Sequence, residues 1–227
     1  MTSTQAPATS SPPRVPAREW LVATGLIALA LVPSVAGGVR LGDVALGVPT
    51  EETARFHADP LPLVLHILSA LVFALLGAFQ FLPTFRRRHL RWHMFAGRYL
   101  LVPAGVVVAA SGLWMTAVYV FPPVDGPALA VSRYVVGAAT LVFLGLAVYR
   151  VIRRDFAAHG AWMMRAYALA MGAGTQVLTS APFLIAFDAP IEFWRLVQMD
   201  AGWLLNVIAA EIIIRRMRSR RLVGPAA

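Results

Sequence analysis

Six runs of predominantly apolar residues, each long enough to cross a lipid bilayer, dominate this 227-residue chain. A membrane-spanning helix needs about 20 such residues. The runs lie at about 19–39, 61–83, 99–121, 129–151, 162–186 and 196–214. Hydrophobic residues make up 59% of the chain and charged residues only 14%, so little of it remains for a soluble domain. The sequence therefore predicts an all-α, polytopic membrane bundle of six transmembrane helices.

All 20 basic residues are arginine, and a six-span bundle divides them unequally between its two sides. One side carries Arg14 and Arg18, then Arg86, Arg87, Arg88, Arg91 and Arg98, then Arg150, Arg153 and Arg154, and finally Arg215, Arg216, Arg218, Arg220 and Arg221. Because arginine-rich loops stay in the cytoplasm, we expect both termini there and a multi-pass protein of the bacterial cytoplasmic (inner) membrane. Topology and anionic lipid headgroups then account for the net charge of +9, and no nucleic-acid partner is expected.

The two ends of the chain differ in composition from its centre. Residues 1–18 are rich in Thr, Ser, Ala and Pro and predict a disordered cytoplasmic tail. Residues 19–216 form a single transmembrane helical-bundle domain, and residues 217–227 form a basic cytoplasmic tail. The first apolar run also resembles a cleavable signal peptide. An uncleaved anchor is favoured because the run continues to Val39.

Five histidines and a few carboxylates are the only side chains available as metal ligands, because the chain has no cysteine. His66 lies about one turn inside the second run. At about 100° per residue it shares a stripe with Phe73, Gly77 and Gln80, so that stripe is expected to face protein. His66 is then either a structural histidine bonded to a neighbouring helix or a ligand or proton carrier.

His93 and His159 stand just before the third and fifth runs, on the same predicted side of the membrane. Two imidazoles entering different helices at one depth have the geometry that axial haem ligation or a small metal site needs. The alternative is that each contacts lipid headgroups or caps its helix. The function of this region depends on whether the two side chains meet.

Arg165 lies in the first turn of the fifth run, where a charge needs a partner. Glu211, near the inner end of the sixth run, is the expected one, and the pair is either a structural clamp or part of a proton or anion route. Asp200 is expected to pair with Arg133 or to contact His66. The inward polar set is completed by Gln80, Gln176 and Asn206, and no run is interrupted clearly enough to predict a broken helix.

Several of these residues form an ordered motif set across four helices. It consists of His66 with Gly77-Ala-Phe-Gln80-Phe81, Arg86, His93, Gly97-Arg98-Tyr99, His159 with Trp162-Met163, Arg165-Ala-Tyr167-Ala-Leu169, Trp203, Asn206 and Glu211. From about His66 to Arg216 the chain resembles a bacterial family of uncharacterised predicted integral membrane proteins built on a domain of unknown function. The resemblance implies a multi-span helical protein without an assigned activity.

The chain departs from that family's pattern at two places, Met94 and Gly160-Ala161, where basic residues are usual. A looser likeness to cytochrome-b-like haem bundles implies haem b as cofactor. The cofactor-binding residues would be His66, His93, His159, Arg98 and Arg165.

Three functions are compatible with the sequence. The first is a redox-associated membrane protein that binds haem b or a metal through histidines near the membrane faces. The second is a small proton-coupled transporter whose route is lined by His66, Asp200, Arg165 and Glu211. The third is a non-catalytic assembly or sensing protein, whose partner is a second copy or another membrane protein. The sequence assigns no catalytic residue and no enzymatic reaction.

Overall fold

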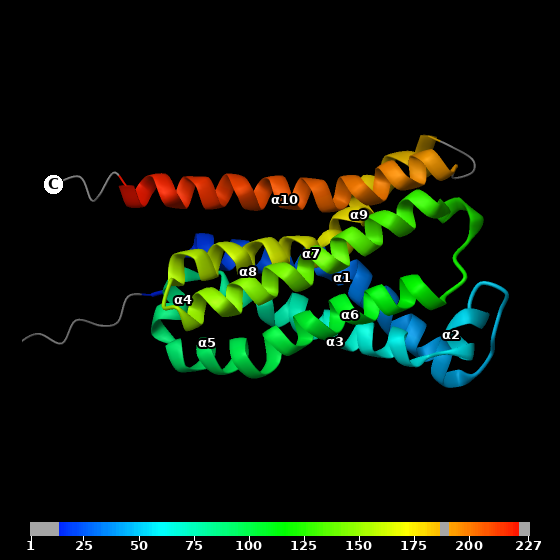
Figure 1. Ribbon diagram of the computed structural model, residues 1–227, viewed down its shortest axis with the longest axis horizontal. Helices are drawn as coiled ribbons and strands as arrows, with labels where there is room; N and C mark the ends of the chain where they lie inside the picture. The colour runs from blue at the N-terminus through cyan, green and yellow to red at the C-terminus, as the bar shows by residue number, and fades with distance from the viewer. Residues whose placement is uncertain (1–13, 187–190, 223–227) are drawn as a thin grey trace, which may run out of the picture.

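The computed structural model describes residues 14–186 and 191–222, and within those ranges every regular element is a helix (Figure 1). The elements are α1 (Ala17–Leu46), α2 (Ala54–Ala58), α3 (Leu61–Gln80), α4 (Pro83–Arg88), α5 (Leu90–Ala96), η1 (Gly97–Leu101), α6 (Val102–Val118), η2 (Pro123–Asp125), α7 (Gly126–Ile152), α8 (Phe156–Ala170), α9 (Gly172–Ala186) and α10 (Glu192–Leu222). The predicted all-α class is confirmed.

Five helical stretches are long and apolar enough to cross a membrane. They are Ala17–Leu46, Leu61–Gln80, Leu90–Val118, Pro123–Ile152 and Glu192–Arg220. The protein is therefore a multi-pass membrane protein. The count of six crossings stays a prediction, because the fifth apolar run does not form one helix.

That fifth run is divided at Met171 into α8 and α9, each of 15 residues, so the expectation of an unbroken span is wrong. Two observations explain the break. Gly172 and Gly174 favour a helix less than other residues do. The side chain of Asn206 on α10 donates a hydrogen bond of 3.1 Å to the Ala168 carbonyl oxygen, which the Gly172 N–H would bond in a continuous helix. Figure 1 shows α8 and α9 following one another along the bundle.

The helix formed by α5, η1 and α6 contains a wider, π-helical turn at Gly97–Leu101. There the Val102 N–H donates to the carbonyl oxygen of Gly97, five residues earlier. Pro103 follows at once, and a proline has no N–H to offer to the carbonyl four residues before it. The sequence Gly97-Arg98-Tyr99 thus lies on a π turn, a local structure that is frequent at functional sites.

One end of the bundle holds α4, α5 and the end of α10, and α2 lies at the opposite end (Figure 1). The start of α1 belongs to the first of these ends, because both oxygens of the Glu19 side chain accept the backbone N–H of Thr84, in the first turn of α4, at 3.1 and 2.9 Å. We call it the arginine end, since α4 carries Arg86, Arg87 and Arg88.

The helix limits differ from the predicted ones at both ends of the chain. The first helix begins at Ala17 and continues to Leu46, well past the predicted end at residue 39. Gly47, with φ of 72°, ends it in the left-handed conformation that glycine adopts most easily. The helix α10 reaches Leu222, so the first part of the predicted basic tail is helical. Residues 1–13 and 223–227 of the two predicted tails lie outside the described residues.

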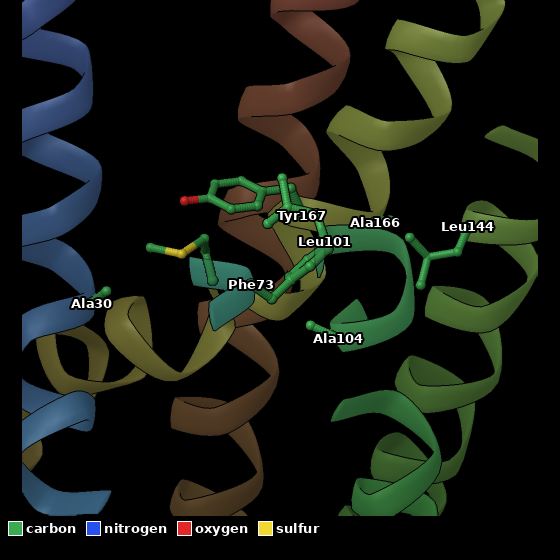
Figure 2. Packing of buried hydrophobic residues seen from close by; sticks show 8 residues of the cluster. Ala30, Phe73, Leu101, Ala104, Leu144, Ala166 and Tyr167 are labelled. Carbon is green, nitrogen blue, oxygen red and sulfur yellow. The ribbon is translucent and has the colours of Figure 1, made fainter. Parts of the chain in front are cut away.

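The core is built around aromatic and small side chains from α1, α3, α6, α7 and α8. Figure 2 shows Phe73 and Tyr167 between Ala30 on α1 and Leu144 on α7. The Tyr167 hydroxyl donates a 2.6 Å hydrogen bond to the Ala74 carbonyl oxygen, so the same residue packs against α3 and bonds to it. Small residues let these helices approach closely, as expected where lipid supplies no hydrophobic driving force between helices.

Gly174 is the position where the packing of α9 is most sensitive to size. A methyl group there would overlap the backbone carbonyl oxygen of Leu29 on α1. We expect Gly174→Ala to lower the free energy of unfolding by about 1–3 kcal/mol, because backbone must move to relieve the overlap. Gly145→Ala on α7 is the matched control, since nothing lies within 4 Å of its added methyl. It should stabilise by about 0.5–1 kcal/mol. Thermal unfolding of the detergent-purified variants compares them, and equal effects would contradict this packing.

Candidate functional site

Two histidines from distant parts of the chain lie at the arginine end. His93 lies on α5, and its Nδ1 is hydrogen-bonded to the side-chain oxygen of Gln80, at the end of α3. His159 lies on α8, and its Nδ1 is 2.9 Å from the Ala147 carbonyl oxygen of α7. The two imidazoles lie close enough to interact electrostatically. Among the described residues, this electrostatic interaction is the link between the two rings, and no hydrogen bond joins them.

The partners of the two rings determine where each ring carries its proton. A carbonyl oxygen only accepts, so Nδ1 of His159 must carry the hydrogen, and Nδ1 of His93 does the same toward the Gln80 oxygen. In a neutral imidazole the other nitrogen, Nε2, then keeps its lone pair. Histidines that bind metals show this arrangement: one nitrogen donates to an oxygen that orients the ring, and the other is the ligand.

Two imidazoles are fewer side-chain ligands than a bare metal ion usually takes from a protein. Within residues 14–186 and 191–222, no group of three or more His, Cys, Asp or Glu side chains is placed to hold a metal. A bare zinc ion takes four ligands, of which the protein supplies at least three. A haem brings four nitrogens of its own, so two imidazoles would be enough side chains to hold one. In addition, the buried Nε2 of Gln80 has no acceptor among the described residues, so this site holds an unsatisfied donor.

His66 does not belong to this pair. Its Nδ1 lies 3.0 Å from the Val108 carbonyl oxygen and 3.2 Å from the Ser111 hydroxyl, both on α6. On α3 it is fourteen residues from Gln80, about 21 Å along the helix. The stripe of His66, Phe73 and Gly77 faces protein as predicted, because Phe73 lies in the core and Gly77 contacts the Tyr167 ring. The three histidines are therefore two sites.

The predicted partner of Arg165 is confirmed. Its guanidinium binds the Glu211 carboxylate through two hydrogen bonds, Nε to Oε1 at 2.5 Å and Nη2 to Oε2 at 3.0 Å. The same guanidinium lies over the Trp162 ring, 4.5 Å from its centre. Both side chains are largely shielded, with exposed fractions of 16% and 31%. The two hydrogen bonds between these side chains join α8 to α10, as expected of a structural clamp.

The expected pairing of Asp200 with Arg133 or His66 is wrong. Arg133 bonds instead to Asp125 at 2.6 Å, and Arg195 binds the other oxygen of the same carboxylate at 3.0 Å. Asp125 directly precedes α7, two turns before Arg133, so the nearer carboxylate takes the arginine. Asp200 accepts a 3.0 Å hydrogen bond from Ser132, and its other oxygen is buried without a partner among the described residues.

The remaining predicted polar residues bind helix to helix. Gln176 donates to the Met199 carbonyl oxygen at 3.0 Å, and Asn206 accepts from the Thr175 hydroxyl at 2.8 Å, so both join α9 to α10. Arg98 is exposed, and its guanidinium lies 5.3 Å from the centre of the Tyr99 ring. Within the described ranges no hydrogen bond links Arg98 to a histidine. Arg98 is therefore not joined to His93 or His159 as a site residue.

Two charged contacts escaped the sequence analysis. Glu19 bonds to the first turn of α4, and Asp125 binds two arginines from α7 and α10. Both carboxylates are buried, at 6% and 5% exposure. The sequence did indicate that Glu19 has a partner, because an acidic residue at the start of an apolar run carries a charge that needs one. The contact of Asp125 with Arg195 had no such indication, since the two residues are seventy positions apart along the chain.

Comparison with known proteins gives one match. The family model described as "Predicted membrane protein (DUF2306)" matches residues 63–214, more than half of the 227-residue chain. The matched segment contains His66, His93, His159, Arg165 and Glu211. No curated protein and no solved structure matches the chain significantly, so no comparison supports the looser likeness to haem bundles.

The clamp between Arg165 and Glu211 can be tested by a double-mutant cycle. We expect Arg165→Leu and Glu211→Leu each to lower the free energy of unfolding by about 1–3 kcal/mol, because each leaves a shielded charge unpaired. The double variant should lose less than the sum of the two. Arg40→Gln is the control, since the Arg40–Asp43 pair is more exposed and 3.8 Å long. It should change stability by under about 0.5 kcal/mol. Additive losses in thermal unfolding would contradict a direct clamp.

Proposed function

We propose that this chain, which belongs to the DUF2306 family of predicted membrane proteins, is a redox-associated membrane protein that binds haem b between His93 and His159. The observation that carries the proposal is the presence at one end of the bundle of two electrostatically interacting imidazoles whose Nδ1 atoms are both occupied by oxygen partners. In their neutral forms both rings keep the Nε2 lone pair, and these two nitrogens would be available to hold the iron of a haem.

The chain's own residues would have distinct roles toward such a group. His93 and His159 would hold the iron, and Gln80 and the Ala147 carbonyl bond to the two rings and would keep them oriented. Arg86, which interacts electrostatically with His93, would add positive charge near the propionates. Bound haem b supplies one-electron chemistry, and the protein tunes it through the ligands and their hydrogen bonds.

A small proton-coupled transporter is the second candidate, favoured by one observation that the sequence did not predict. The break between α8 and α9 lines a partly open cavity together with His66. In membrane proteins, interrupted helices are tolerated where they line a cavity, and in transporters such helices form substrate sites. A purified protein without bound cofactor would make this candidate, or a non-catalytic assembly or sensing role, the better one.

We also propose that the arginine end faces the cytoplasm of a bacterial cell, in the cytoplasmic membrane. Support comes from the arginines that gather at this end and from the preference of such residues for the cytoplasmic side. Exposed arginines there would also contact anionic headgroups. His93 and His159 would then lie near the cytoplasmic face.

Single cysteines in this cysteine-free chain test the orientation. Glu51→Cys, in the exposed segment before α2, should react in intact cells with a thiol reagent that cannot cross the membrane. His89→Cys, exposed between α4 and α5, should react only after the cells are opened. The reverse pattern would overturn the orientation, and reaction of both in intact cells would contradict a fixed one.

The absorption spectrum of the purified protein tests the cofactor. We expect a Soret band that shifts on reduction, with about one haem per chain. The band should be lost or shifted in His93→Ala and His159→Ala, because each removes one axial ligand. His89→Ala is the matched control: His89 lies four residues before His93, is exposed and stacks on Phe85. Its spectrum should equal that of the parent protein.

Two results would overturn the proposal. The first is a protein purified from haem-sufficient cells that shows neither a Soret band nor haem by extraction. The second is a band that persists unchanged in both His93→Ala and His159→Ala. Metal analysis of the same preparation separates haem iron from a bare metal ion, which would appear without the band.

A further inference from the structure

A cavity of about 210 Å³ lies where the broken α8–α9 segment meets α1, α3 and α6. Its lining includes Ser34 from α1, His66 and Phe73 from α3, Val108 from α6, and Met171 and Gly174 at the helix break. It does not include any residue of the His93–His159 pair. The cavity is therefore a second site, separate from the proposed haem site.

The lining is apolar apart from two side chains. His66 and Ser34 are the polar residues among those that form the wall, and no Asp, Glu, Lys or Arg belongs to it. A charged ligand would lose its hydration there without gaining a counter-ion. The occupant that fits this wall is a neutral molecule with a largely apolar body and at most one or two polar atoms.

The protonation of His66 defines what such a polar atom must be. The Val108 carbonyl oxygen only accepts, so Nδ1 of His66 carries the hydrogen in that 3.0 Å contact. The Ser111 hydroxyl donates to the Val107 carbonyl oxygen at 2.6 Å and accepts from the same Nδ1. Nε2 of the neutral ring is consequently an acceptor. A ligand that bonds to it must bring an O–H or N–H donor.

The size and position of the cavity narrow the ligand further. A dry cavity of about 150 Å³ lined by apolar side chains can hold one benzene ring, so about 210 Å³ holds one ring with small substituents. The wall also includes the aromatic side chain of Phe73. Ala173 in the lining is exposed on α9, and Ser34 and His66 belong to membrane-length helices. Entry would thus be from the bilayer, which favours a lipid-soluble ligand.

We infer that this cavity binds a neutral, membrane-soluble molecule of single-ring size whose hydroxyl group donates a hydrogen bond to His66: a phenol-like ligand. The Phe73 side chain packs against the ring, and the residues of the helix break form the wall opposite α3. The inference is independent of haem binding, because the two sites share no residue.

A cysteine at the cavity wall measures occupancy directly. In the cysteine-free chain, Ser34→Cys introduces one thiol into the lining. In nanodiscs, p-cresol should slow its reaction with a small neutral thiol reagent in a saturable way. The matched control is Ser219→Cys, a serine on an exposed part of α10 outside the cavity. Its rate should not change with p-cresol, which separates occupancy from an effect on the lipid.

The hydrogen bond is tested by a second probe. 4-Methylanisole has the size of p-cresol but no O–H, so it should protect Ser34→Cys only at about tenfold higher concentration, the loss expected for one hydrogen bond. In the Ser34→Cys/His66→Leu protein the two probes should protect equally. Ala70→Leu, which adds bulk to the lining and keeps His66, should abolish protection by both.

Three outcomes would overturn the inference: no saturable protection by p-cresol, equal protection by the two probes in the parent protein, or a preference for p-cresol that survives His66→Leu. The first two need no His66 variant, so they stand even if His66→Leu fails to fold. Absorption spectra separate the two sites. His66→Leu should keep the Soret band, and His93→Ala should keep the protection by p-cresol.

Discussion

Hydrogen bonds from side chains of one helix to backbone carbonyl oxygens of another hold this bundle in its arrangement. Hydrocarbon offers no water to polar groups, so each interior donor must find its acceptor within the protein. Among the described residues, such bonds between helices include His66 to Val108, His159 to Ala147, Tyr167 to Ala74 and Asn206 to Ala168. They join α3 to α6, α8 to α7, α8 to α3 and α10 to α8. The chemistry that the structure supports follows from these contacts.

These bonds allow a histidine to have a structural role and a chemical role at the same time. An imidazole that donates from Nδ1 to a carbonyl is a structural element, and the same bond leaves Nε2 as a free acceptor or ligand. His66 and His159 both show this state. At the arginine end a second imidazole interacts electrostatically with the first, and the proposed haem site rests on this pair. At His66 the neighbour is a cavity, which favours a small donor ligand.

The break at Met171 connects packing to function in a different way. Asn206 occupies the Ala168 carbonyl oxygen, and Gly174 lets α1 approach the start of α9. The interrupted backbone is thereby covered by α1 and α10, as irregular structure in a membrane must be. Its remaining free side contributes to the cavity wall. The clamp of Arg165 and Glu211 holds α8 against α10 between the middle of α8 and the break.

Composition and periodicity were sufficient to predict the membrane class, the helical fold and the inward faces of several helices, because apolar length and stripe direction are local properties of a sequence. They also predicted the partner of Arg165, since a charge in an apolar helix needs an opposite charge at its depth. Periodicity reports which face of a helix points inward but not which helix that face meets. Only the tertiary structure therefore decided that Arg133 binds Asp125, that His93 bonds to Gln80, and that a cavity adjoins His66. The sequence did not predict the division of the fifth apolar run for the same reason. The apolar pattern of that run is continuous, and the side-chain amide that donates to the Ala168 carbonyl oxygen belongs to Asn206, on a helix far along the chain.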